Sequence, residues 1–545
     1  MSAPITTPFG HAIPPAPRHS VTVHMPGWAA AERFAYDVGS LVASFKNAYP
    51  RMKPHPDITS LSQAVLGRLG TADRDCYLFS SLQSARECVE YSTSSARDNG
   101  TDKQPVALDQ ISIRCFTAKD LFYAVIFPLP QSATVAGFWS SPGAGLSSRF
   151  AEANLACLEC LTQVAVPDSE TPRPRFDGAV HHLLRERIIS YLERAPCSLA
   201  QPSPTTGDVY LFQSGMAAIY KPHSYMLSLY HGTTVLFGMA FTNTVTLFGE
   251  LGPGLKFFPR GIDEDLSDLE AFLQDERVHG RKVQAIWAEF PANPSLITPN
   301  LVRLRSLADE YDIVLAIDDT IGSWANIDIT SKVDILVTSL TKSFNGYADV
   351  IAGSAILNPS SAKYRDLKPL FDRHYVPELY ADDVETIERN SRDYLTRAAI
   401  LNANASALAQ YFAQCAKDPS NAVVRALYPS VNASGKYYTQ VMRSETTHFK
   451  PGYGSLLSVE FCDLATTRAF YEELNVHKGP HQGAPLTLAV PYNVCVYGKR
   501  LDWAIEHGYK PTQIRIAVGL EDTNTLLEDF RIAVVAANQA KGQAE

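Results

Sequence analysis

The sequence predicts an α/β protein whose central part is built on a mostly parallel β-sheet. From about residue 170 onward, stretches with helical spacing alternate with short apolar runs, which is the rhythm of βαβ units. One such run, VLAIDDT at 314–320, is apolar up to its acidic end, as expected for a strand covered on both faces. Because several of these runs end in small or polar residues, we expect the functional residues to lie at the strand ends.

Length and composition indicate how many domains the chain forms and that it folds around a core. A chain of 545 residues allows about three or four domains. We divide it into an arm at 1–56, an additional α+β region at 57–165, a large domain at 166–395 and a small C-terminal domain at 396–545. With 46% hydrophobic and 19% charged residues, the composition is that of a globular protein with a sizeable core.

Charge and cysteine content exclude several classes of function. The chain has 48 Lys and Arg against 57 Asp and Glu, a net charge of −9, and no long basic run, so we expect neither nucleic-acid nor membrane partners. The start resembles no targeting signal, and no apolar run has transmembrane length. Nine scattered cysteines favour reduced thiols in the cytoplasm. Cys157-x-x-Cys160 has no second pair, so we predict no metal site.

The N-terminal region is predicted to form an extended arm, followed by an additional α+β region. Residues 1–27 contain six prolines and little periodicity, whereas 28–48 has helical spacing. After it comes Tyr49-Pro50-Arg51, an ordinary turn or, given its phenol and guanidinium, a phosphate-binding pair. Strand-like runs at 111–116 and 122–127 alternate with helical segments, and the polar run 92–104 is expected to be an exposed loop or a disordered tip.

Two segments carry the clearest chemistry. The strand-like run 210–212 leads through Ser214-Gly215-Met216 into a helix start, which is an anion site because free N–H groups and the helix dipole point at the ligand. Further on, the apolar run 334–337 ends in small polar residues, including Ser339 and Thr341, before Lys342. A lysine held there between two buried strands is partly desolvated, which lowers its pKa and suits it to imine formation. The alternative is a surface lysine.

Other strand ends add polar groups. The run 314–320 ends in Asp318 and Asp319, which would either serve the site or cap a helix. Arg515 lies inside an apolar strand and needs a buried anion, either a substrate carboxylate or an internal salt-bridge partner. Between them, 384–408 has the period of one long helix joining two domains.

Together these segments resemble the Cys/Met-metabolism family of pyridoxal-phosphate (PLP) enzymes. SLTKSFNGYADV at 339–350 matches the family's cofactor-lysine signature, and EFPANP at 289–294 and RIAVGLE at 515–521 are similar to two further motifs in the family's order. The resemblance covers roughly 205–530 and implies fold type I: a seven-stranded, mostly parallel sheet and a smaller α/β C-terminal domain. The long N-terminal half resembles fungal-type cystathionine γ-synthases.

The resemblance implies PLP as cofactor and a role for each matching residue. Lys342 is the Schiff-base lysine and Asp318 pairs with the ring nitrogen. Asn293 donates to the phenolic oxygen, Glu289 orders the substrate site, and Arg515 binds the substrate carboxylate. The phosphate is held by Ser214, Gly215, Met216, Ser339, Thr341, Tyr49 and Arg51. Because the last two act from a neighbouring subunit in the family, a homodimer or homotetramer with shared sites is implied.

Two positions depart from the family. Phe241 occupies the place of an aromatic platform where relatives carry tyrosine, so it stacks without a phenol. His481 replaces a serine, and it would carry protons, reshape the acceptor pocket or only pack. We take Lys342, Phe241 and His481 as candidate catalytic residues, with His481 also counted among the substrate-binding residues.

The expected activity is γ-replacement on an O-acyl-L-homoserine, O-acetyl-L-homoserine being the first candidate. With cysteine as acceptor this is a cystathionine γ-synthase-like, trans-sulfuration reaction. Alternatively, a carbon nucleophile such as a β-keto acid replaces the thiol and a C–C bond forms. A γ-lyase and a PLP-binding scaffold without catalysis are the remaining alternatives.

Overall fold

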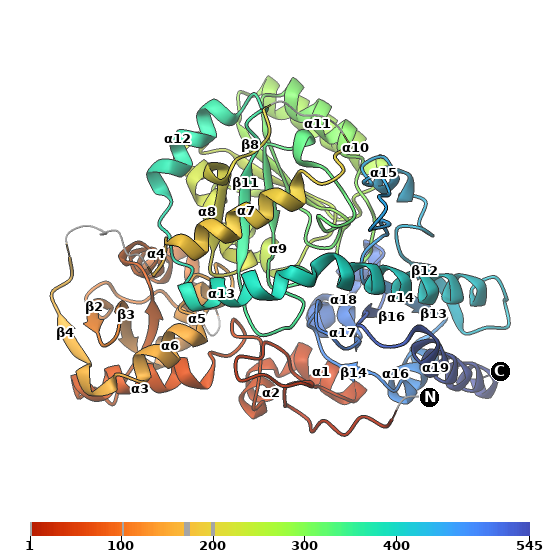
Figure 1. The fold of residues 1–545 in the computed structure, drawn as a ribbon, viewed down its shortest axis with the longest axis horizontal. Coiled ribbons are helices and arrows are strands. Elements are labelled where there is room, and N and C mark those ends of the chain that lie inside the picture. Colours follow the sequence, from red (N-terminus) through yellow and green to blue (C-terminus); the bar gives the residue numbers. More distant parts are fainter. Residues whose placement is uncertain (1–2, 101–102, 168–174, 198–201, 545) are drawn as a thin grey trace.

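The computed structural model describes residues 3–100, 103–167, 175–197 and 202–544 and contains three β-sheets, each with its own helices (Figure 1). Along the chain, a four-stranded sheet is followed by a seven-stranded and then a five-stranded sheet. The seven-stranded sheet lies in the middle of the molecule in Figure 1. In the part of the chain that the structure describes, no helix is both long and apolar enough to cross a bilayer.

The central sheet confirms the predicted large domain fold. Its strands are β5 (Val209–Phe212), β6 (Thr233–Phe237), β7 (Leu255–Phe258), β8 (Val283–Glu289), β9 (Val314–Asp318), β10 (Ile335–Thr338) and β11 (Gly353–Leu357). Their order is β5-β11-β10-β9-β8-β6-β7. The pairs from β10 to β7 are parallel, whereas β11 is antiparallel to both of its neighbours. The parallel strands therefore bring their carboxyl ends to one edge.

Helices cover both faces of this sheet. On one face, α7 (Ala179–Leu192), α10 (Asp263–Val278) and α11 (Leu301–Glu310) contribute Leu184, Leu269 and Leu304 to one core. On the other, α8 (Gly215–Tyr230), α9 (Thr242–Glu250) and α12 (Tyr364–His374) contribute Met226, Phe248 and Phe371 to a second. Covering both faces explains why the strands are apolar runs without alternation.

The C-terminal sheet has the order β12 (Val423–Leu427), β13 (Leu456–Phe461), β16 (Gln513–Ala517), β15 (Leu488–Val490), β14 (His477–Lys478). The helices α16 (Leu464–Glu473) and α19 (Thr523–Ala544) pack against each other and, with this sheet, form one core. The shorter helices of this half are α15 (Gly435–Thr439), α17 (Tyr492–Tyr497) and α18 (Leu501–Glu506).

The connection between the two domains differs from the single helix predicted. It consists of α13 (Ala381–Asn390) and α14 (Tyr394–Cys415), separated by a 3₁₀ turn at Ser391–Asp393. At the break, the Asn390 carbonyl accepts a hydrogen bond from Arg397 at 2.9 Å, and the Ser391 carbonyl accepts one from the Tyr191 hydroxyl at 2.9 Å. Because side chains satisfy these carbonyls, the backbone leaves the helix there without an orphaned acceptor.

The added N-terminal layer is an antiparallel sheet of order β1 (Arg74–Phe79), β3 (Leu121–Pro128), β2 (Ser112–Thr117), β4 (Thr162–Val164). Its helices are α3 (Pro56–Leu69), α4 (Leu82–Thr93), α5 (Ser132–Ser140) and α6 (Ser148–Leu155). The strands β2 and β3 agree with the predicted runs. The expected loop 92–104 is partly ordered, because α4 continues to Thr93 and a 3₁₀ turn covers Ser95–Arg97; residues 101–102 lie outside the described residues.

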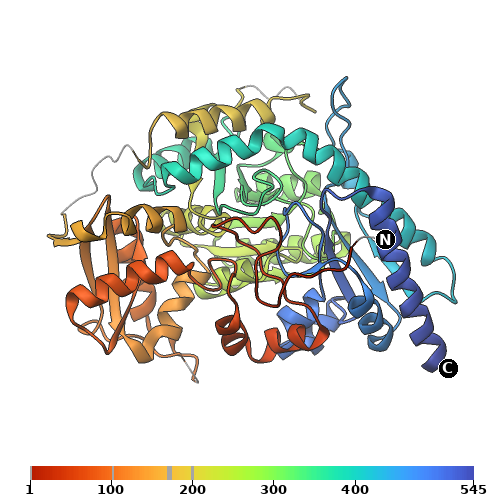
Figure 2. The ribbon, with the colours of Figure 1, turned by 60° about the horizontal axis from the view of Figure 1, so that its bottom comes forward.

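The arm packs along the molecule instead of standing free (Figure 2). The Val21 N–H donates to the Ala348 carbonyl and the Met25 N–H to the Lys478 carbonyl, both at 2.8 Å. The following helical stretch forms two helices, α1 (Trp28–Tyr36) and α2 (Val38–Ser44), with Asp37 between them. The arm therefore contacts both the large and the small domain of its own chain.

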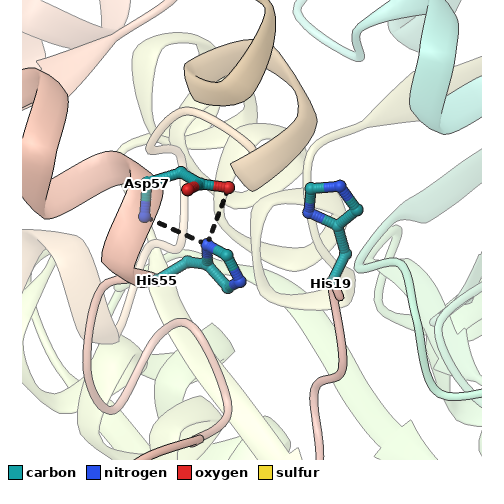
Figure 3. A group of neighbouring side chains, drawn as sticks. All are labelled: His19, His55 and Asp57. Carbon is teal, nitrogen blue, oxygen red and sulfur yellow. Dashed lines mark hydrogen bonds and ion pairs between the residues drawn. The ribbon is translucent and has the colours of Figure 1, made fainter. Parts of the chain in front are cut away.

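A polar cluster fastens the arm to the added layer (Figure 3). The two rings of His19 and His55 lie 5.5 Å apart, and His55 caps α3 by accepting from the Asp57 N–H. Arg18 pairs with Asp57 at 3.1 Å and with Glu152 of α6 at 3.0 Å, and Glu152 also contacts His19 at 2.8 Å. These ion pairs join the arm, α3 and α6 into one body.

Candidate active site

A cavity lies where the carboxyl ends of β8, β9 and β10 meet the first turn of α8 and the loop after β14. It brings together most of the residues singled out in the sequence. Its lining includes Tyr49, Arg51, Gly215, Met216, Phe241, Glu289, Asn293, Asp318, Ser339, Lys342 and Arg515. The topology explains the gathering, because parallel strands deliver their C-terminal side chains to one edge.

Lys342 is the reactive group of the cavity. It follows β10 in a tight turn closed by the Gly346 N–H, which donates to the Lys342 carbonyl at 2.8 Å. Burial lowers the pKa of the Lys342 ammonium, and the nearby cations Arg51 and Arg515 act in the same direction against Tyr49 and Asp318. The lowered pKa favours the neutral, nucleophilic form of the side chain.

The first turn of α8 forms an anion cradle. The Ser214 Oγ accepts from the Ala217 N–H at 3.0 Å, as an N-cap, and donates to the Gly143 carbonyl at 2.8 Å. A Cβ on Gly215 would lie 2.6 Å from the Cβ of Ser339, so only glycine lets the two backbones approach this closely. Exposed N–H groups and the helix dipole thus face the cavity.

Gly143 completes this cradle, and the sequence analysis assigned no role to it. Its φ is +67°, and a Cβ there would lie 2.6 Å from the Ser214 Oγ and 2.7 Å from the Arg51 Cδ. The residue belongs to the added N-terminal layer, so its place beside α8 depends on long-range packing. In the sequence, only the two glycines of the run GAG at 143–145 hinted at an unusual backbone conformation here.

Tyr49 and Arg51 lie in the cavity of their own chain. The Lys342 Nζ is 4.9 Å from the centre of the Tyr49 ring, and the Arg51 guanidinium is 5.4 Å from the centre of the Phe241 ring. Burial would raise the pKa of the Tyr49 phenol, but Lys342 and Arg51 lower it overall. The expected contact with a neighbouring subunit stays a prediction that a single chain does not test.

Glu289 and Asp318 are the two buried acids of the site. The Glu289 carboxylate accepts from the Phe241 N–H at 2.6 Å and from the Asn293 N–H at 3.0 Å, so it fixes the aromatic platform and the asparagine together. Burial, with Asp318 nearby, raises its pKa well above the usual range. Burial also raises the pKa of Asp318, although the Thr320 N–H donates to its Oδ1 at 2.9 Å. A cation placed beside Asp318 would favour its carboxylate form.

Arg515 offers a free anion site on β16. Its Nη1 donates to the Asn293 Oδ1 at 3.2 Å and its Nη2 to the Pro480 carbonyl, while its buried Nε has no partner. Among the described residues no carboxylate lies within ion-pair distance of it. The alternative of an internal salt bridge therefore lacks a partner in this structure.

Two predicted residues lie differently from expectation. The hydroxyl of Thr341 is engaged with the backbone of Ala352, donating to its carbonyl at 3.2 Å and accepting from its N–H at 3.0 Å, so Thr341 does not line the cavity. Its place is taken by Thr320, whose Oγ1 accepts from the Ser339 N–H at 2.7 Å. Asp319 accepts from the Thr338 hydroxyl and does not cap a helix with its side chain.

His481 lies beside the cavity and not in its lining. It is only 4% exposed, its ring centre is 6.1 Å from that of Tyr49, and both of its ring nitrogens lack a hydrogen-bond partner. Burial, with the positive charges of Lys342 and Arg515, lowers its pKa well below the usual range. The imidazole is therefore neutral at physiological pH, with a lone pair available.

The residues of the cavity fit a phosphate-bearing pyridine aldehyde. The orphaned Nε of Arg51 and the cradle of α8 suit a phosphate, Asp318 suits a basic ring nitrogen, and Lys342 suits the aldehyde carbon. These groups lie on different elements around one cavity. The donor set is thus that of a PLP site.

Two family models match the chain. Residues 190–535 match the model of the Cys/Met metabolism PLP-dependent enzyme, and residues 57–147 match that of the fungal trans-sulfuration enzyme N-terminal domain. The first covers the large and small domains, and the second covers most of the added layer. Both agree with the resemblance drawn from the motifs.

Several characterised proteins resemble the chain over nearly its full length. It is 34% identical to an alanine racemase of Aspergillus violaceofuscus, covering 96% of each chain. It is 30% identical to a cystathionine γ-synthase-like enzyme of Amanita muscaria, covering 98% of this chain and 97% of that one. Cystathionine γ-synthase of Neurospora crassa is 29% identical, covering 97% of this chain and 98% of that one.

A solved structure agrees with the fold. Cystathionine γ-synthase of Xanthomonas oryzae superimposes with a TM-score of 0.55 at 19% identity, covering 69% of this chain and 92% of that chain. The shorter bacterial chain accounts for the difference in coverage. The likeness bears on the fold alone.

Proposed function

This chain belongs to the Cys/Met-metabolism family of PLP-dependent enzymes, and from that premise we propose that it performs γ-substitution on an O-acyl-L-homoserine, with O-acetyl-L-homoserine as the first candidate. Family membership makes PLP its cofactor and makes it an enzyme of the trans-sulfuration type. The donor, the acceptor and the role of each site residue are our proposals.

The cofactor would be held at both ends. Gly215, Met216, Ser339 and Arg51, which line the cavity, would bind its phosphate. Ser214 lies outside the lining, where its hydroxyl caps α8 and donates to the Gly143 carbonyl. Asp318 would face the ring nitrogen, Asn293 the phenolic oxygen, and Phe241 one face of the ring. When bound, PLP supplies an electron-withdrawing ring that acidifies the Cα–H bond of the amino acid.

The substrate would be oriented by Arg515 and deprotonated by Lys342. The free Nε of Arg515 is available to the α-carboxylate, and Glu289 keeps Asn293 in position for the same region. The neutral amine of Lys342 would take the proton from Cα. Loss of a further proton at Cβ allows the γ-ester to leave as a carboxylate, and a nucleophile then bonds to Cγ.

One observation carries this proposal: a lysine with a lowered pKa shares a cavity with a buried acid and with an arginine that has no carboxylate partner among the described residues. Each of the three is expensive to bury without a ligand. A PLP-bound amino acid would supply a partner to all of them. This argues against a scaffold without catalysis.

Two acceptors are candidates. Cysteine would make the protein a cystathionine γ-synthase, which is the printed name of the Neurospora crassa relative. A carbon nucleophile is favoured by the site itself, because Phe241 removes the phenol of the platform and His481 adds a free base. The cytoplasm and a homodimer or homotetramer remain expectations that accompany either reading.

Acetate release tests the donor half of the proposal. Purified PLP-loaded protein would receive O-acetyl-L-homoserine alone, and acetate, 2-oxobutyrate and ammonia would be quantified. We expect acetate release that depends on Lys342 and that rises when a suitable acceptor is added. Release of 2-oxobutyrate and ammonia unaffected by any acceptor would instead indicate a γ-lyase.

The Aspergillus violaceofuscus relative adds a control. Because that protein is named an alanine racemase, L-alanine would be incubated with the same preparation and its enantiomers separated by chiral chromatography. We expect no appreciable D-alanine on the time scale of acetate release. Fast racemisation without acetate release would overturn the γ-substitution proposal.

A further inference from the structure

A second cavity opens directly beside the PLP site. It has a volume of about 400 Å³ and shares five lining residues with the first cavity: Tyr49, Arg51, Phe241, Lys342 and Pro480. Its outer wall comes from the arm, α1, α2 and α5. We call this cavity the chamber. Its contact with Lys342 and Phe241 makes it the route along which a second reactant would reach the amino acid.

The walls of the chamber are mainly apolar. Besides the shared Phe241 and Pro480, eleven of the described lining residues carry no polar side-chain group apart from one indole: Val21, Val23, Phe34, Val38, Val42, Met52, Pro54, Ala133, Ala136, Gly137 and Trp139. The indole N–H of Trp139 is already used, donating to the Pro50 carbonyl at 2.9 Å. Such a lining favours an alkyl or aromatic body in the ligand.

The chamber has basic side chains in its described lining and no acidic ones. Its described lining contains Arg51, Lys103 and Lys342 and no aspartate or glutamate. Glu289 and Asp318 line the first cavity instead, and Glu289 is occupied by two backbone N–H groups. The ammonium group of an amino acid such as cysteine would therefore be buried in the chamber without a carboxylate partner. A neutral or anionic molecule meets no such penalty.

His481 supplies a base to the chamber. It lines the chamber and not the first cavity, and both of its ring nitrogens are buried without partners. The loop 480–483 is held by Arg515, which donates to the Pro480 carbonyl, and by Gly483, whose Cβ position is only 2.6 Å from the Lys342 Cα. The imidazole is thus fixed close to the reacting lysine.

We propose that the chamber binds the second substrate, that this substrate is an apolar carbon acid without an ammonium group, of the β-keto acid class, and that His481 removes the proton from its acidic carbon. This inference rests on the γ-substitution proposed above and names its acceptor. Lys103, which no proposed cofactor contact uses, suits the carboxylate of such an acid.

The step balances without a further reactant. The acidic C–H bond of the acceptor breaks, the proton passes to a ring nitrogen of His481, and the electron pair forms the new bond to Cγ. The γ-ester has already left with its own electron pair as a carboxylate. The net change converts O-acyl-L-homoserine and a carbon acid into a γ-substituted amino acid and a carboxylic acid.

Proton exchange tests His481 without turnover. The PLP-loaded protein would be incubated in D₂O with 3-oxooctanoate and no amino acid, and exchange at C2 followed by NMR against buffer alone. We expect the wild type to accelerate exchange at least about tenfold, H481N and H481S to lose this effect, and H448N, at an exposed histidine, to keep it. Full exchange in both His481 variants with unchanged PLP absorbance would overturn the role of His481.

Calorimetry tests the chamber. We expect 3-oxooctanoate to bind at least about tenfold more tightly than acetoacetate, and cysteine not to bind. A136F, which fills the chamber from α5, should weaken 3-oxooctanoate binding about tenfold. V302F, at an exposed position of α11, should leave the binding unchanged. Binding of cysteine that A136F abolishes would overturn the inference. If acetate is released normally but neither keto acid binds, this inference fails and the γ-substitution proposal stands; if no acetate is released, the failure lies in the proposed function.

Discussion

At the scale of single residues, the site depends on charges that are costly to bury. Lys342 illustrates this, because burial and two arginines favour its neutral amine. In K342R the side chain stays cationic and has no nucleophilic form. We expect K342R to lose the visible absorbance of the lysine-bound cofactor and to release acetate at least about 100-fold more slowly. The control K499R, at an exposed lysine, should keep both properties. A K342R protein with normal absorbance and rate would contradict the assignment.

Asp318 is the second residue whose charge state matters. A carboxylate there keeps the cofactor ring protonated, and an amide of the same shape does not. We expect D318N to bind PLP and yet to release acetate about 100- to 1,000-fold more slowly, the usual range for one electrostatic group in a closed site. The exposed Asp366 provides the matched control D366N. A rate loss in D318N explained entirely by weaker PLP binding would assign Asp318 a structural role only.

At the scale of elements, one contact of the arm depends on a histidine that is uncharged. His24 lies in the arm, its Nδ1 accepts from the Lys478 N–H at 3.2 Å, and its ring is 5.3 Å from that of His477. Burial, then His477 and Lys478, lower the pKa of His24 from 6.5 to about 4. Burial likewise lowers the pKa of Lys478 to about 7 and also lowers that of His477.

These shifts predict that the arm loosens in acid. Because the folded pKa of His24 is below its unfolded value, protonation favours the undocked arm, so docking is fully stable above pH 6.5 and weakens as the pH falls towards 4. The shift of His24 alone lowers the free energy that stabilises docking by roughly 3 kcal/mol over this range, and the lowered pKa of His477 acts in the same direction. Amide protection factors of residues 10–25, corrected for the intrinsic exchange rate at each pH, should fall between pH 7 and 4.5, and less so in H24L. Protection factors independent of pH in the wild type would refute this.

The comparison of sequence and structure is also clearest for elements. The strands that end at Phe212, Asp318 and Thr338 were predicted, because buried parallel strands are apolar runs that end in polar residues. The break between α13 and α14 at Ser391–Asp393 was not predicted. It depends on hydrogen bonds from the side chains of Arg397 and Tyr191 to backbone carbonyls at the break, and local sequence does not reveal these bonds. The position of Thr341 was missed for a similar reason: its hydroxyl pairs with Ala352 across the turn, which local sequence does not reveal.

At the scale of the whole molecule, the arm and both domains of one chain contribute residues to the cavity. Tyr49 and Arg51 reach Lys342 and Phe241 from within the same chain, while the arm is fastened by Arg18 and His19. The sharing of sites between subunits, which the resemblance implies, stays a prediction. Length and composition carry no information on which copy of the arm fills which cavity.

Mixed oligomers distinguish the two arrangements. K342A and R51A chains would be co-expressed with different tags, and the mixed species purified. If Arg51 serves its own chain, every cavity in the mixture lacks one of the two residues, and we expect acetate release no higher than that of R51A alone. A mixed species clearly more active than either parent would show that Arg51 crosses to a neighbouring subunit. PLP affinity of the mixed species, measured by fluorescence, provides a readout independent of activity.

The most direct test of the account is an acceptor competition analysed by mass spectrometry. PLP-loaded protein would receive O-acetyl-L-homoserine with equal concentrations of cysteine and 3-oxooctanoate in one tube. The chamber and His481 predict acetate release with a carbon-substituted amino acid as the main product and little cystathionine. Cystathionine as the dominant product would contradict the proposed acceptor, and the absence of acetate would contradict γ-substitution itself.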